Sequence, residues 1–408
     1  MRSRPRIAVI SPFLDKRHGT ERCVVEQIER LAEEFEVHVY SARVQDLDLT
    51  KIVWHKTGIN VAPHVLAYCW FLISNQVRRK LDKWLHNLNY DIVFSPGINC
   101  FDADVIAVHI VFAEFYRLAT QDLQLLRNKV AFWPRLIHRH LIYHLFIALE
   151  RIVYSNHSLP LIVISHKMEA DLNRSFSRTG NTKLLYHGID PAHMNPERRQ
   201  MLRDGSRNKL GLPADAFALL IVGNDWRKKG LYTLLDAVVA LDDPNVWVLV
   251  RGDDDRMSSR DAINRVELKG RVKFLPSIPE IDSYYAACDA YVGPSLEDSF
   301  AIPPLEAMAC GVPVIVSAQA GVSELIVHND NGLILRDSAD STTLSGLIRT
   351  LRQDANLRER ISSRAAITAG EFTWDRNGKA FVQFVSDLLQ NKERNSATTE
   401  MHSKVIRN

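Results

Sequence analysis

The chain has 408 residues, of which 46% are hydrophobic and 24% charged, a balance typical of a folded globular protein. Because this length exceeds what one compact core usually holds, we expect two domains. The net charge of +3 is small for the size, whereas a nucleic-acid-binding protein would carry a concentrated basic field. We therefore expect no nucleic acid partner.

The 5 cysteines are scattered along the chain and form no CxxC pair. This spacing speaks against a disulfide framework or a zinc site and favours a reducing, cytoplasmic compartment. The first apolar run, Ile7–Ile10, is too short for the core of a secretory signal, so we expect a strand there. No run reaches the ~18 apolar residues of a spanning helix, and we expect no transmembrane segment.

The first half of the sequence alternates short apolar runs with a segment of helical period. We expect strands at residues 7–10, 37–40, 92–94, 105–108 and 161–164, and a helix over residues 21–35. The apolar runs do not alternate strictly with polar residues. They are typical of strands buried on both faces, as in a parallel sheet covered by helices.

The same pattern then starts again. We expect strands at residues 218–222, 246–250, 272–275, 290–292 and 312–316, and a helix over residues 231–241. Two successive series of this kind predict an α/β protein with two doubly wound domains. The polar stretch Asn195–Leu210 places the boundary near residue 200, and the polar tail at 391–408 is expected to be disordered.

The segment Asp298–Glu306 is the strongest candidate for chemistry. Two prolines, Pro303 and Pro304, suit the first turn of a helix, so the two acids flank a helix start. The N–H groups at the turn Ala301-Ile302 would form an anion site suited to a diphosphate, and Glu306 could accept two hydroxyl groups of a ribose. The alternative is that Asp298 caps the helix and Glu306 is a solvated acid.

The run Pro294–Ser317, PSLEDSFAIPPLEAMACGVPVIVS, resembles the signature of family 4 glycosyltransferases, which have the GT-B fold. Further motifs similar to that family follow the expected order over almost the whole chain: residues 18–21, 104–109, 161–166, 186–190, 222–230, 320–324 and 372–374. The resemblance implies two Rossmann-like domains facing each other across a cleft. It implies an acceptor-side domain at 1–200, a nucleotide-sugar-binding domain at 201–372, and a helix at 373–390 that returns to the N-terminal domain.

The resemblance also implies roles for single residues. Glu306 would hold the ribose of a nucleoside-diphosphate sugar, and Asp298 a hydroxyl of the sugar. The remaining implied site residues are Lys229 with Arg227 or Lys228 at the diphosphate, Ala301 and Ile302 at the helix start, Gly223 in the loop that opens the second domain, Gly19 beside the β-phosphate and His109 over the transferred sugar. Of these, His109, Asp298 and Lys229 are the expected catalytic residues, and no metal or other cofactor is expected.

Three positions depart from the family pattern. Asp298 stands where a Glu is usual, His18 where a Gly is common, and Asn224 where a base is usual. The departures leave Arg227 and Lys228 as alternatives for the second positive charge, or as solvated residues. For His109 the alternative is a core histidine without a role in the reaction. The acidic run at 253–255 could suggest a metal site, but we expect a polar loop.

Two segments of the first half interleave bases with aromatic residues, at residues 64–84 and 124–154. Such segments can lie on an anionic membrane surface, near a lipid-linked acceptor. The alternative is ordinary helices that pack on the sheet and have basic outer faces.

Taken together, we expect a retaining glycosyltransferase that uses a UDP- or GDP-sugar and acts on a glycan or lipid-linked acceptor. Its setting would be cell-surface polysaccharide, lipopolysaccharide or glycolipid synthesis, in the cytoplasm or at the inner face of the membrane. A GT-B sugar-nucleotide epimerase and a non-catalytic nucleotide-sugar-binding protein are the alternatives.

Overall fold

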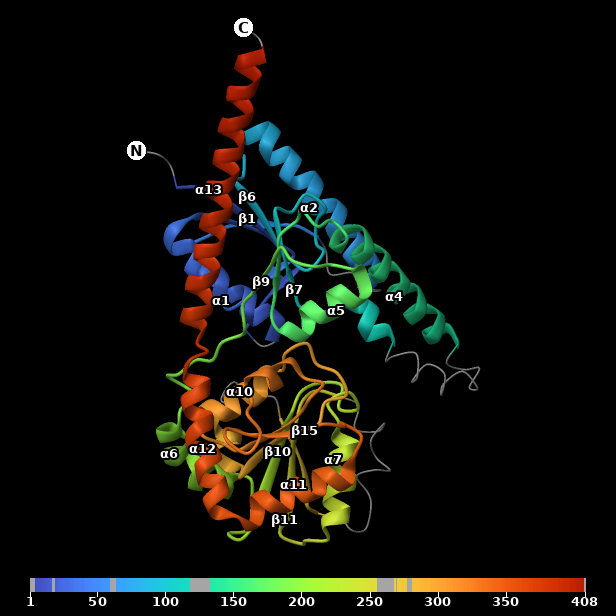
Figure 1. Ribbon diagram of the computed structural model, residues 1–408, viewed down its shortest axis with the longest axis vertical. Coiled ribbons are helices and arrows are strands. Elements are labelled where there is room, and N and C mark those ends of the chain that lie inside the picture. The colour runs from blue at the N-terminus through green and yellow to red at the C-terminus, as the bar shows by residue number, and fades with distance from the viewer. Residues whose placement is uncertain are drawn as a thin grey trace. The chain divides into compact units, whose positions relative to one another are not determined.

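The computed structural model describes residues 4–16, 19–58, 64–117, 133–254, 268, 270–276 and 281–406, without the side chains of 64, 133–136, 138 and 396–406. The chain forms two compact units (Figure 1). The first comprises Met1–Tyr186 with Trp374–Asn408, and the second His187–Thr373. The boundary we expected near residue 200 therefore falls within the second unit.

A parallel sheet forms the centre of the first unit. Within the described residues its strand order is β5 (Val53–Lys56), β3 (Glu36–Ser41), β1 (Arg6–Ile10), β6 (Ile92–Pro96), β7 (Val105–Val108), β8 (Leu161–Val163) and β9 (Thr182–Leu184). The short strands β2 (Phe13–Leu14) and β4 (Arg43–Val44) pair separately. The middle strands are buried along almost their whole length, as the unbroken apolar runs predicted.

Long helices cover this sheet: α1 (Gly19–Glu34), α2 (His64–His86), α4 (Trp133–Tyr154), α5 (His166–Phe176) and α13 (Trp374–Ile406). The last of them, α13, packs against α1, and its Phe381 ring lies 4.9 Å from the ring of Phe94 in β6. Arg30 of α1 forms an ion pair of 2.6 Å with Asp375 of α13. The C-terminal helix is thus part of the core of the first unit.

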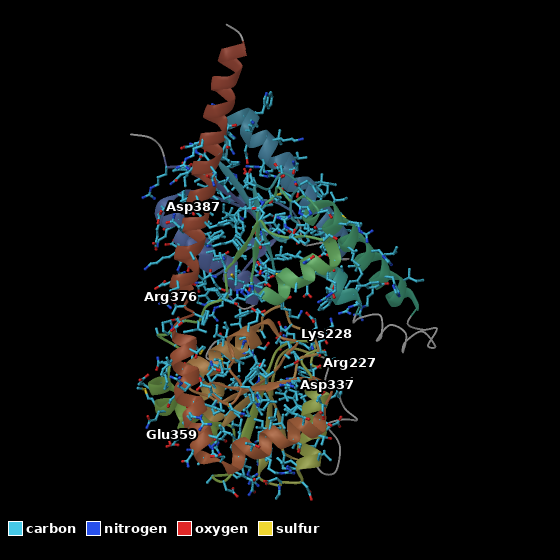
Figure 2. All side chains as sticks on the ribbon, in the orientation of Figure 1. Arg227, Lys228, Asp337, Glu359, Arg376 and Asp387 are labelled. Atoms are coloured by element: carbon cyan, nitrogen blue, oxygen red, sulfur yellow. The ribbon has the colours of Figure 1, made fainter. Side chains whose placement is uncertain are left out.

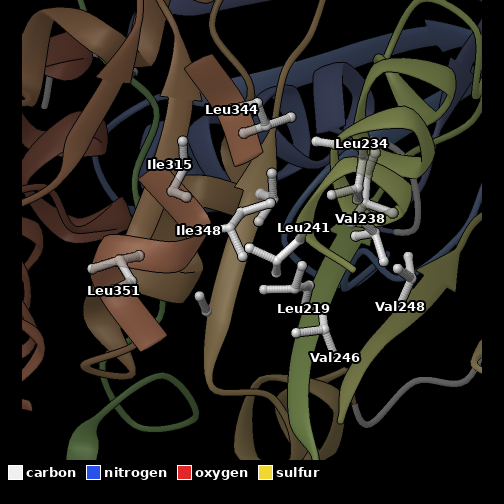
Figure 3. Packing of buried hydrophobic residues seen from close by; sticks show 14 of the residues in the cluster. Leu219, Leu234, Val238, Leu241, Val246, Val248, Ile315, Leu344, Ile348 and Leu351 are labelled. Carbon is white, nitrogen blue, oxygen red and sulfur yellow. The ribbon is translucent and has the colours of Figure 1, made fainter. Parts of the chain in front are cut away.

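A second parallel sheet forms the centre of the other unit. Its order is β12 (Val272–Leu275), β11 (Val246–Arg251), β10 (Phe217–Val222), β13 (Ala290–Gly293), β14 (Val314–Ser317) and β15 (Leu333–Leu335). The surrounding helices are α6 (Pro196–Lys209), α7 (Leu231–Leu241), α9 (Asp282–Ala287), α10 (Ile302–Ala309), α11 (Ser341–Gln353) and α12 (Ala355–Gly370), with a 3-10 turn at Gly321–Leu325. Leucine, isoleucine and valine side chains of α7 and α11 fill one core against β10 and β11 (Figure 3). The predicted α/β fold with two doubly wound domains is confirmed.

Two segments that we expected to be irregular are helical. The stretch assigned to a linker contains α6, whose Arg203 and Arg207 donate to the carbonyl oxygens of Cys288 and Ala287 at the end of α9, at 3.0 and 3.1 Å. These arginines satisfy carbonyl groups that a helix end leaves without partners, which is why a polar sequence packs here. Likewise, α13 continues to Ile406 where we expected a disordered tail.

Each sheet has a point where the strand order reverses. In the second unit the chain runs from β10 outward through β11 and β12, and then returns to the other side of β10 with β13. Loops that leave the carboxyl ends of two such strands diverge and leave a crevice, where ligands bind in open α/β sheets. The loops after β10 and β13 are therefore the place to look for a site.

Candidate functional site

The loops that follow β10 and β13 pack closely on each other. The N–H of Leu296 donates to the carbonyl oxygen of Lys228 at 2.7 Å. Gly230 permits this approach: it has a φ of 80°, and a Cβ there would stand 2.0 Å from the carbonyl oxygen of Pro294. The backbone packing brings the residues after each strand to one end of the sheet.

Lys229 and Asp298 meet at this point. The Nζ of Lys229 donates to Oδ2 of Asp298, and the pair is largely buried, with 25% and 14% of the side chains exposed. The main chain of Asp298 also pairs with the loop after β14, because its N–H donates to Gln319 and its carbonyl accepts from Gly321. Burial raises the pKa of the nearby phenol of Tyr291, and the charge of Asp298 raises it further. Both residues were expected site residues from the sequence, but their contact was not predicted.

Gly223 lies directly beneath the Lys229 side chain. A Cβ at residue 223 would stand 2.7 Å from Cε of Lys229, and the φ of 145° at this position favours glycine. The next residue, Asn224, accepts the N–H of Asp253 at 2.8 Å, and Asp254 accepts the N–H of Trp226 at 2.7 Å. Asp253 and Asp254 thus join two loops, as expected of a polar loop, while Asp255 lies outside the described residues.

The start of α10 follows Asp298 and has an unusual backbone. Ala301 has a φ of 70°, in the region that residues with a side chain rarely adopt, and no side chain caps this helix start. Asp298 accepts the N–H of Phe300 at 3.4 Å and not that of a helical residue, so the alternative that it caps the helix is wrong. Strained backbone of this kind is more frequent at functional sites. Ala301 and Ile302 therefore remain candidate anion ligands.

Glu306 lies on the first turns of α10 and is only 5% exposed. Its Oε2 accepts the hydroxyl of Tyr285, from α9, at 2.8 Å. Burial together with Glu306 raises the pKa of Tyr285 well above its usual value, so the phenol stays protonated and remains the donor. The alternative that Glu306 is a solvated acid is wrong. A buried carboxylate held in place by a tyrosine hydroxyl suits the recognition of further hydroxyl groups.

Arg227 and Lys228 come just before Lys229 in the loop after β10 (Figure 2), and Lys228 is partly buried. Lys228 forms an ion pair of 3.1 Å with Asp225, so its charge is balanced locally. Arg227 is exposed. The structure thus brings Lys229 to Asp298 and leaves the other two bases outside that contact.

The first unit holds the two remaining candidates. Gly19 is the first residue of α1, a helix of 16 residues, and is exposed; His18 lies outside the described residues. His109 follows β7 and is 8% exposed. Burial lowers its pKa to about 4, so the imidazole is neutral near pH 7 and can either donate to or accept from a hydroxyl group.

One residue of the site was missed in the sequence. Tyr285 belongs to the pair Tyr284-Tyr285 in a short helix, a pattern that predicts only packing. Its link to Glu306 depends on α9 and α10 lying together, which no local signal reveals. A buried tyrosine needs a partner for its hydroxyl, and this is the one signal that could have suggested a search.

Residues 203–368 match the family model described as "Glycosyl transferases group 1". Among curated proteins, the chain is 28% identical over 205 residues to the D-inositol 3-phosphate glycosyltransferase of Thermomonospora curvata, covering 46% of this chain and 47% of that protein. It is 28% identical over 185 residues to the lipopolysaccharide core biosynthesis glycosyltransferase LpsE of Rhizobium meliloti, covering 44% and 53%. These matches span about half the length of each relative.

Solved structures resemble almost the whole chain. WaaG, a glycosyltransferase involved in lipopolysaccharide biosynthesis, has a TM-score of 0.74 at 19% identity, covering 93% of this chain and 99% of its own. Sucrose-phosphate synthase from Thermosynechococcus elongatus has a TM-score of 0.76 at 21% identity, covering 95% and 100%. HepE from Anabaena, in complex with UDP-glucose, has a TM-score of 0.69 at 20% identity, covering 94% and 99%. These likenesses show that the fold is GT-B.

Proposed function

We propose that the protein is a retaining family 4 glycosyltransferase that needs no metal ion. It moves a sugar from a UDP- or GDP-sugar to a glycan or a lipid-linked acceptor, in cell-surface polysaccharide, lipopolysaccharide or glycolipid synthesis. The observation that carries the proposal is the largely buried Lys229–Asp298 pair beside the uncapped start of α10. The match of residues 203–368 to a glycosyltransferase family model supports it.

Each part of the donor has a proposed partner on the second unit. The buried carboxylate of Glu306, held by Tyr285, takes the ribose hydroxyl groups. The N–H groups of Ala301 and Ile302, at the positive end of α10, take phosphate oxygens. Lys229 neutralises part of the negative charge of the diphosphate, and Arg227 or Lys228 is the second base. Gly223 leaves room for the Lys229 side chain.

The chemistry requires stabilisation of a leaving group. When the bond between the anomeric carbon and the phosphate oxygen breaks, negative charge grows on the β-phosphate. A lysine and a helix N-terminus stabilise such charge most strongly where little water is present. When Lys229 binds the phosphate, it releases Asp298. An oxygen of Asp298 can then accept a hydrogen bond from a sugar hydroxyl. The acceptor attacks from the side of the leaving group, and the departing phosphate takes the acceptor proton.

On the first unit, we propose that His109 contacts a hydroxyl of the transferred sugar and that Gly19 lets the backbone approach the β-phosphate. The neutral imidazole of His109 suits this role, because it adds no charge to a site that must bind a dianion. A proposed lipid-linked acceptor fits the relative named for lipopolysaccharide core biosynthesis.

A donor panel tests the proposal. The protein is incubated with UDP-, GDP- and ADP-sugars, with and without membrane extract, and nucleotides and sugars are analysed separately. We expect release of one nucleoside diphosphate, with the sugar entering lipid or glycan. Interconversion of sugar nucleotides would instead indicate the epimerase, and binding without turnover the non-catalytic protein.

A further inference from the structure

The outer face of α2, at residues 64–86, carries a row of large apolar side chains. Its members are between 43% and 79% exposed. We call them the α2 stripe: Leu66, Trp70, Ile73, Val77, Leu81 and Trp84. On the opposite face of the helix, Phe71 and Asn75 are buried against the sheet. The stripe is therefore not the side by which α2 joins the core.

The members of the stripe are three or four residues apart, so they share one face of the helix. At about 100° per residue they fall within an arc of about 80°, and at about 1.5 Å per residue they extend for about 27 Å. Scattered single apolar residues on a surface need no explanation, but a continuous row of this length does.

Basic residues flank the stripe on both sides. By helical position, Lys80 and Lys83 lie along one edge and Arg78 along the other, and all three are exposed. The one acid in the sequence of α2, Asp82, points inward and is 3% exposed. It accepts the hydroxyl of Tyr40 at 2.8 Å, lies 3.2 Å from Nδ1 of His55 and forms an ion pair of 3.1 Å with Arg78. The exposed face of α2 is thus apolar at its centre and positive along the edge of Lys80 and Lys83, while Asp82 balances the charge of Arg78 on the other edge.

The neighbouring helix α4 has the same character. The rings of Tyr68 in α2 and Phe146 in α4 lie 4.8 Å apart, so the two helices are in contact there. Three large apolar residues of α4 are exposed: Ile137, Leu141 and Ile152. The acid of α4, Glu150, is again buried, where it accepts the N–H of Phe112 at 2.6 Å, while Arg151 is exposed.

We propose that the α2 stripe is a docking surface for an anionic lipid bilayer, with the helix lying in the plane of the interface. An apolar face edged by lysine and arginine binds such a surface through buried apolar area and attraction to lipid phosphates. Tryptophan favours the headgroup level, and the stripe holds two. Among the described helices, none combines the length and apolar character needed to span a bilayer. This inference does not depend on the proposed reaction.

Co-sedimentation with vesicles tests the inference on the full chain. One set of vesicles is phosphatidylcholine alone, and the other mixes it equally with phosphatidylglycerol. We expect binding to the mixed vesicles at low salt and much weaker binding to the neutral ones. Trp70→Ser with Trp84→Ser should weaken binding about tenfold or more, since it removes the deepest apolar contacts. Lys80→Gln with Lys83→Gln should weaken it about fivefold per lysine and reduce its salt dependence.

The matched control is Met201→Ser with Ile367→Ser, which removes two apolar residues of similar exposure from the second unit. This variant should bind vesicles as the wild type does. Because all substituted residues are exposed, melting temperatures should stay unchanged. The inference is overturned if the wild type ignores anionic vesicles at low salt, or if the tryptophan variant binds them fully. It is equally overturned if sedimentation equilibrium shows a dimer that the tryptophan variant abolishes, because a second copy would then cover the stripe.

Discussion

Nζ of Lys229 contacts Oδ2 of Asp298, so a lysine and a carboxylate from loops after two adjacent parallel strands neutralise each other. Both groups are less exposed than ordinary surface charges. A diphosphate that binds Lys229 must displace this carboxylate, which then becomes available to a sugar hydroxyl. Substitution of Lys229 should therefore lower the affinity for nucleoside diphosphate, whereas substitution of Asp298 should not.

Lys229→Met should weaken binding of the preferred nucleoside diphosphate about tenfold to a hundredfold, because a charge-assisted hydrogen bond is lost. Asp298→Asn should leave that affinity equal or higher, since the competing charge is gone, yet it should lower sugar transfer. Calorimetry with UDP, GDP and ADP measures the affinities. Lys209→Met, at an exposed lysine of the same unit, is the control. Unchanged affinity in Lys229→Met would contradict the assignment.

Glu306→Gln should remove discrimination for ribose. The wild type is expected to bind the ribonucleoside diphosphate more tightly than its 2′-deoxy analogue, because a carboxylate accepts two hydroxyl groups. The variant should bind both with similar affinity. Tyr285→Phe should cost about 1–3 kcal/mol of unfolding free energy, because buried Glu306 loses a donor. Equal discrimination in wild type and Glu306→Gln would show that Glu306 does not contact the ribose.

Gly223→Ala should both destabilise the protein and disturb the site. The positive φ costs on the order of 1–3 kcal/mol for a residue with a side chain. The new methyl group would also push against the Lys229 side chain, and nucleotide affinity should fall. Gly346→Ala is the matched control, because that glycine lies in α11 with open space around it, and alanine should stabilise the helix by up to about 1 kcal/mol. Urea unfolding and calorimetry together check both effects, and a Gly223→Ala variant with wild-type stability and affinity would refute them.

His109 should make stability depend on acid pH. Its pKa is about 4 in the folded protein against 6.5 in the unfolded chain, so the unfolded state takes up a proton first as the pH falls. The stabilising contribution is complete above pH 6.5 and is lost towards pH 4, amounting to about 3 kcal/mol in all. His109→Asn should therefore lose less stability than the wild type between pH 7 and pH 5. A loss of stability in His109→Asn that runs parallel to that of the wild type would contradict the burial of His109.

In transfer assays, substitution of His109 has a separate expected result. His109→Ala should mainly lower turnover and leave nucleotide affinity close to that of the wild type, because the proposed contact is to the sugar. Full activity in this variant would show that His109 is a core histidine without a role in the reaction.

The sequence predicted the strands well because buried parallel strands leave unbroken apolar runs, as in Phe217–Val222. The sequence did not predict α6, because the packing of Arg203 and Arg207 depends on carbonyl groups that become available only when α9 ends beside them. From composition alone, such an arginine-rich segment is predicted to be a linker.

In the candidate site, too, the residues could be predicted from local sequence, whereas their contacts depend on the fold. Asp298, Glu306 and Lys229 could be named from residue type and spacing, since the acids flank a helix start. The contact between Lys229 and Asp298 could not be predicted from the sequence, because it depends on β10 and β13 being neighbours across a reversal of strand order. The support of Glu306 by Tyr285 depends likewise on two helices meeting, which leaves no periodic signal in the sequence.

The most direct test of the central claim is transfer of labelled sugar from the preferred nucleoside-diphosphate sugar into membrane extract, comparing wild type with Asp298→Asn and Lys229→Met. We predict label in lipid or glycan with equal release of nucleoside diphosphate for the wild type, and a large loss of both in each variant. Transfer that is unaffected by both substitutions, or no transfer from any donor by the wild type, would contradict the claim that this pair belongs to the active site of a glycosyltransferase.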